Sequence, residues 1–87
     1  MKPGEELIQQ GLYDLANGEE TVAALVVAIG APRLRRVGLM LPAQLPSSPE
    51  HRLYEKLQLI DPDSAHSQYN ALIRRLVSFE RAAECGV

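Results

Sequence analysis

The sequence predicts an all-α protein, a compact bundle of four to five helices with a long C-terminal helix, in a single helical domain over residues 1–87. Apolar residues recur every three or four positions near the C-terminus, which is the period of a helix with one buried face. Apolar content is 46% but aromatic content only 5%, which leaves an aliphatic core of the kind that helices build. A chain of 87 residues suffices for one small core.

The stretch from Asp61 to Glu84 is the one around which the other segments are expected to pack. Its apolar stripe comprises Ala65, Tyr69, Leu72, Leu76, Phe79 and Ala83. Ile73 and Val77 widen this stripe on one flank. Asp61 is the expected cap with Pro62 at the first helical position, and a start at Ser67 is the alternative. The stripe is wider than a coiled-coil seam and therefore predicts the wall of a core.

Three further helices are expected over residues 3–16, 19–29 and 49–60. Asn17-Gly18 ends the first, because both residues tolerate a left-handed backbone. The second is apolar all round and is expected at the centre, although its β-branched residues leave a buried strand as the alternative. Either Ser48 or a Ser47–Glu50 capping box begins the third, which turns Leu53, Tyr54 and Leu57 inward.

Residues 32–37 are expected to form a short basic helix that stops at Gly38. The proline-rich segment after it is interpreted as an extended connection that carries three leucines into the core, Leu39, Leu41 and Leu45.

Several classes of function find no support in the composition. The apolar run 22–29 is too short to cross a membrane, and acids interrupt the N-terminus where a signal peptide needs an apolar segment, so a cytoplasmic location without membrane binding is expected. Cys85 has no second cysteine with which to form an internal disulfide. No catalytic constellation or cofactor motif is found, and Asp61, Asp63 and His66 make only a weak metal-ligand set.

Two arginine groups form the candidate interaction surface. Arg33, Arg35 and Arg36 follow a Gly-Ala-Pro turn, and Arg74, Arg75 and Arg81 lie on the last helix. A helix-turn-helix interpretation of the first group fails, because Gly38 and Pro42 leave its second helix under two turns long. The alternatives are a phosphate-binding patch and a solvated face with salt bridges to Glu19, Glu20 or Asp14.

A second candidate site is a pocket between the last two helices. Tyr54, His66, Tyr69 and Asn70, joined by Arg74, are expected at its mouth. Core packing of both tyrosines, with their hydroxyls near the rim, is the competing interpretation.

The function expected from these features is a small protein-interaction or regulatory module that self-associates, as a homodimer, or joins a larger assembly. Its two strongly apolar helices have few others to cover them, which is why a partner surface is expected. A nucleic-acid-binding regulator or antitoxin that uses the arginine clusters is the alternative. An enzyme is not expected.

Overall fold

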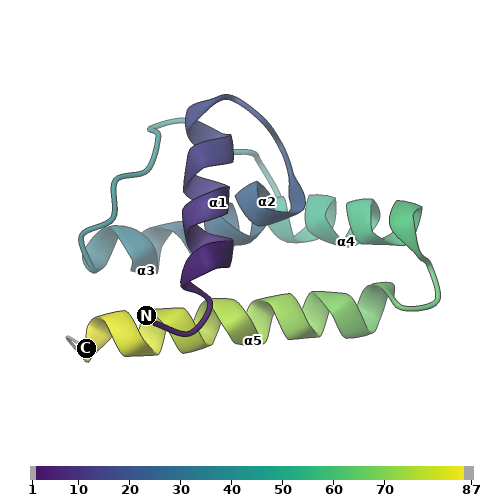
Figure 1. Ribbon diagram of the computed structural model, residues 1–87. Helices are drawn as coiled ribbons and strands as arrows, with labels where there is room; N and C mark the ends of the chain where they lie inside the picture. The colour runs from purple at the N-terminus through teal and green to yellow at the C-terminus, as the bar shows by residue number, and fades with distance from the viewer. Residues whose placement is uncertain (1, 86–87) are drawn as a thin grey trace.

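The computed structural model describes residues 2–85 and contains five helices in a compact arrangement, with no strand in that range. The helices are α1 (Glu5–Ala16), α2 (Val22–Ile29), α3 (Ala31–Arg36), α4 (Pro49–Ile60) and α5 (Ala65–Glu84). α4 and α5 run antiparallel and are joined by a tight turn, while α1 stands crosswise to α5, to the left of α4 (Figure 1). The all-α prediction is confirmed, including the long C-terminal helix.

α2 is the centre of the core, and it is a helix rather than the alternative buried strand. Five consecutive residues, 24–28, are buried on it. α1 crosses it at Gly11, where an added Cβ would lie 2.3 Å from the Ala23 carbonyl oxygen and 2.4 Å from a Val27 methyl carbon. Two helix backbones approach this closely only where one residue has no side chain.

Thr21 is the N-cap of α2, which begins at Val22, three residues later than expected, and Thr21 also ties α2 to α1. Its hydroxyl accepts a hydrogen bond from the Ala24 amide, as an N-cap does, and donates one to the Asp14 carboxylate. Asp14 is only 5% exposed and also accepts a bond of 2.9 Å from the Gln10 side chain. One hydroxyl therefore joins the end of α1 to the start of α2.

α1 begins at Glu5 rather than at Pro3, because Gly4 adopts a left-handed backbone with φ of 74°. A Cβ on Gly4 would lie 2.7 Å from the carbonyl oxygen of Arg75. The N-terminal segment thus turns sharply where it touches α5, and only glycine fits both the angle and the space.

The start of α5 differs from the prediction. The helix begins at Ala65, and Asp61 does not cap it. Instead, the Asp61 carboxylate accepts hydrogen bonds from the Asp63 amide and the Ser64 hydroxyl, which closes a separate turn between α4 and α5. Ser48 is the N-cap of α4 and Pro49 its first residue, as one of the two alternatives had it, but the Ser48 side chain forms no capping hydrogen bond.

The apolar stripe of α5 is covered largely by the chain itself. Leu76 and Phe79 are 3% and 6% exposed, Ala65 is buried, and Tyr69, Leu72 and Ala83 are partly buried against the core. Ile73 and Val77 are half-buried outside the main cluster. The total accessible surface of 5354 Å² is close to the roughly 5,100 Å² expected for a folded monomer of this mass.

The segment between α3 and α4 is extended, as expected. Leu39 and Leu41 pack against the core, whereas Leu45 is half-buried outside the main cluster. α4 buries Leu53 and Leu57 and keeps Tyr54 at the edge of the core, as its sequence predicted.

Candidate interaction surface

Arg33 on α3 is bound to two glutamates at the C-terminal end of α5. Its Nε and Nη2 donate to the two oxygens of Glu84 at 2.8 and 2.7 Å, which is a bidentate pair, and its Nη1 donates to Glu80 at 3.2 Å. The salt bridges expected from the sequence, to Glu19, Glu20 or Asp14, do not form here. Arg33 instead fastens the short helix α3 to the last turns of α5.

Glu80 is buried at the corner where α2 meets α3, with only 4% of its surface exposed. A Cβ on Gly30 would lie 2.9 Å from Oε2 of Glu80 and 2.7 Å from a methyl carbon of Leu76. Burial raises the pKa of Glu80, and the charge of Arg33 opposes that rise. Gly30 therefore leaves the space in which α5 and this carboxylate pack.

Glu84 lies among three arginines. The hydrogen bonds from Arg33 lower the pKa of Glu84, and the charges of Arg33, Arg36 and Arg81 act in the same direction. Arg36 and Arg81 are exposed and lie within 4 Å of no carboxylate oxygen of residues 2–85. The end of α5 thus carries a cluster of arginines with an excess of positive charge.

The other predicted arginines face outward. Arg35 donates to the carbonyl oxygen of Pro42 at 2.8 Å, which holds the start of the extended connection against α3. Arg74 has a marginal contact of 3.5 Å with the carbonyl oxygen of Asn70. Arg75 is exposed and forms no ion pair with the described part of the chain. The six arginines therefore do not form one patch: three surround Glu84 and three point elsewhere.

The four residues expected at a pocket mouth form two pairs, one between α4 and α5 and one on the exposed surface of α5. The rings of Tyr54 and Tyr69 meet edge to face, with centroids 5.9 Å apart, and both pack against the core. The side chains of His66 and Asn70 are exposed and 3.2 Å apart. Burial raises the pKa of Tyr69, and the nearby charge of Glu50 adds to that effect. Both tyrosines therefore take part in the packing of α4 against α5.

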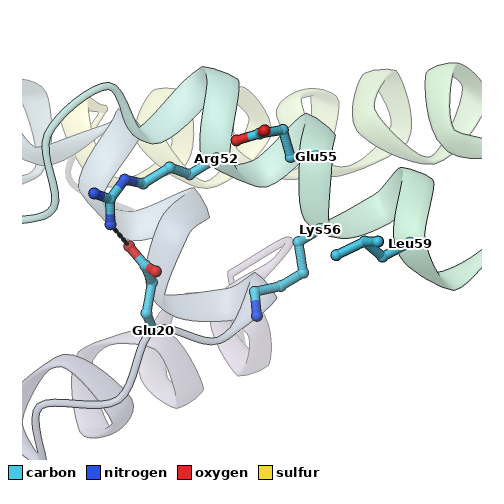
Figure 2. A pocket seen from close by; sticks show the side chains of 5 residues that line it. All are labelled: Glu20, Arg52, Glu55, Lys56 and Leu59. Carbon is cyan, nitrogen blue, oxygen red and sulfur yellow. Dashed lines mark hydrogen bonds and ion pairs between the residues drawn. The ribbon is translucent and has the colours of Figure 1, made fainter.

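A groove lies on α4 at a place where we expected none from the sequence. It has a volume of about 380 Å³ and is lined by Glu20, Arg52, Glu55, Lys56 and Leu59. Figure 2 shows Arg52 reaching across to Glu20, with which it forms an ion pair. Acidic and basic side chains alternate along this groove, and Leu59 at its end is 87% exposed. The spacing of three and four residues on α4 is the signal that could have revealed this lining.

Sequence reasoning missed the partners of Arg33, which lie 47 and 51 residues further along the chain. Within residues 2–85 no group of three or more His, Cys, Asp and Glu side chains could hold a metal ion. The same range contains no helix that is both long and apolar enough to cross a membrane. Comparisons with protein-family models, curated proteins and solved structures found no match to this chain.

Proposed function

We propose that this chain is a small protein-interaction module that self-associates as a homodimer through the outward face of α5. The observation that carries the proposal is a row of exposed residues on α5 at intervals of four, three, four and three. These residues are Ser67, Ala71, Arg74, Ser78 and Arg81. The spacing is that of a helix–helix seam, and the small side chains in it permit close approach.

Charge complementarity favours a second copy as the partner. Positive charge gathers on α3, on the second half of α5 and before α1, which lie at one end of the molecule (Figure 1). Seven of the nine Lys and Arg residues are there, namely Lys2, Arg33, Arg35, Arg36, Arg74, Arg75 and Arg81. The turn that begins α5, at the opposite end, carries Asp61 and Asp63, both exposed. A molecule polarised in this way attracts an inverted copy of itself.

An antiparallel α5 pair brings these opposite charges together under a twofold axis. Arg81 and Asp63 are each nine residues from Leu72 in the sequence, on opposite sides of it. If the axis passes near Leu72, Arg81 of each copy therefore lies beside Asp63 of the other. Such a contact is isologous and closed, so it yields a dimer rather than a filament. The two helix dipoles are then antiparallel as well, which is favourable.

The proposed dimer is held together by charge, whereas the dimer expected from the sequence would bury apolar surface. The apolar stripe of α5 is covered within the chain, and each copy has the surface of a folded monomer. The association is therefore expected to depend on charge and to weaken with salt.

Sedimentation equilibrium at micromolar concentration tests this proposal. We expect a dimer at low ionic strength that dissociates toward a monomer in about 0.5 M salt, where charges are screened beyond a few ångströms. Arg81→Glu should weaken the dimer, whereas Lys56→Glu, the same charge change on α4 beside the groove, should not. A monomer at low salt would contradict the proposal.

Nucleic-acid binding, in a regulator or an antitoxin, is the second candidate, because Arg74, Arg75 and Arg81 are exposed and free of ion pairs with residues 2–85. Phosphate contacts of this kind weaken steeply with salt. Fluorescence anisotropy of a labelled DNA duplex and a labelled RNA strand at low salt measures this directly. Binding by a monomer that is lost in Arg74→Gln and Arg81→Gln would favour this candidate over the dimer, and no binding would remove it.

A further inference from the structure

The guanidinium of Arg33 presents its best binding edge to the surface. Nε and Nη2 form the planar edge that matches two oxygens of a carboxylate or a phosphate, and the carboxylate of Glu84 fills it at 2.8 and 2.7 Å. Glu84 is the last residue of α5, and its side chain is 39% exposed. The group that fills this edge is thus a side chain at a helix end, where the chain is least constrained.

A second contact holds Arg33 in place independently of Glu84. Nη1 donates to Glu80 at 3.2 Å, and Glu80 is fixed by burial against the corner at Gly30. If the Glu84 side chain rotates away, Glu80 still orients the guanidinium with its Nε–Nη2 edge toward solvent. A binding group held in this manner is preorganised, which lowers the entropic cost of taking up a ligand.

Arg36 and Arg81 add positive charge near the carboxylate that fills this edge. Both act on the Glu84 carboxyl and lower its pKa, after the hydrogen bonds of Arg33. With Glu84 displaced, the positive charges of Arg33, Arg36 and Arg81 remain around the vacated edge, and the carboxylate of Glu80 is the one that still bonds to Arg33. This excess favours a phosphate, which carries nearly two negative charges and three acceptor oxygens, over a carboxylate with one charge.

We propose that Arg33, Arg36 and Arg81 form a binding site for a phosphate group, and that the Glu84 carboxylate occupies this site as an internal competitor. The ligand displaces Glu84 from the Nε–Nη2 edge of Arg33, while Glu80 keeps its bond to Nη1. The site shares Arg81 with the proposed α5 seam, but Arg33, the residue whose edge binds the ligand, and Arg36 both lie on α3 and outside the seam.

The test is an NMR titration of the full chain with inorganic phosphate, and in a parallel arm with acetate, at constant ionic strength near pH 7.5. The readouts are the side-chain Nε–Hε resonance of Arg33 and the backbone amide of Glu84. We expect saturable shifts with phosphate and much weaker ones with acetate. Glu84→Gln should tighten phosphate binding about three- to tenfold. The reason is that the Glu84 carboxylate fills the site most of the time, and the substitution removes this competitor.

Matched variants decide whether the effect belongs to this site. Glu19→Gln makes the same change in net charge on an exposed loop and should leave phosphate affinity unchanged. Arg33→Lys keeps the charge but removes the planar edge, and it should abolish the saturable response. If that variant unfolds by circular dichroism, Arg36→Gln at an exposed position serves in its place and should weaken binding. Equal effects of Glu84→Gln and Glu19→Gln, or shifts that never saturate in Glu84→Gln, would overturn the proposal.

Discussion

Replacing Thr21 with Val tests the link between α1 and α2. Valine has nearly the shape of threonine but no hydroxyl, so the substitution removes the bond from the Ala24 amide and the bond to the Asp14 carboxylate together. Loss of an N-cap costs about 1 kcal/mol. Loss of a hydrogen bond to a charged group costs about 1.5–3 kcal/mol, and Asp14 then keeps only Gln10 as a side-chain partner.

The two losses share one hydroxyl and are not additive, so we expect a total of about 2–3 kcal/mol. For a domain of this size that lowers Tm by roughly 10–20 °C. Urea unfolding followed by circular dichroism measures the change in the free energy of unfolding. Thr21→Ser, which keeps the hydroxyl, is the matched control and should lose less than about 1 kcal/mol. A Val variant within about 0.5 kcal/mol of the parent would refute the role assigned to this hydroxyl.

Two further predictions follow from close packing and from charge. Gly11→Ala should destabilise the fold by about 1–3 kcal/mol, measured by urea unfolding, because the overlap of the new methyl group with the Ala23 carbonyl outweighs the gain of about 1 kcal/mol in helix propensity. A variant more stable than the parent would contradict the close α1–α2 crossing. Because the pKa of Glu84 is lowered in the fold, its stabilising contribution is present at pH 7 and is lost as the pH falls through that lowered pKa. The stability difference between the parent and Glu84→Gln should therefore be larger at pH 7 than at pH 3, and a difference independent of pH would contradict the Arg33 pair.

The helices could be predicted from the sequence because their signals are local. The spacing of the stripe placed Leu76 and Phe79 of α5 in the core, and the same reasoning placed Leu53 and Leu57 of α4 there. The ends of the helices were less predictable, because a polar residue near a helix start can either cap the helix or form a turn before it. Asp61 looked like a cap but closes a turn, whereas Thr21, which lies inside the expected helix 19–29, is the N-cap of α2.

The interaction surface was predictable only as a set of charges. The sequence showed which arginines exist, but their partners depend on which helices meet, and α3 meets the end of α5 across about half the chain. The space that accommodates Glu80 depends on Gly30, the residue between α2 and α3, and the sequence does not show that α5 packs against it. The pairing of Tyr54 with Tyr69 likewise follows from the antiparallel packing of α4 and α5.

The most direct test of the proposed dimer is a charge exchange between the two ends of α5, read by sedimentation equilibrium at low salt. Asp63→Arg alone and Arg81→Glu alone should each weaken the dimer, because each places like charges in contact across the twofold axis. The double variant restores opposite charges at both contacts, so we expect it to dimerise nearly as well as the parent. A double variant no tighter than either single variant, or a parent that is monomeric, would contradict the antiparallel α5 pair.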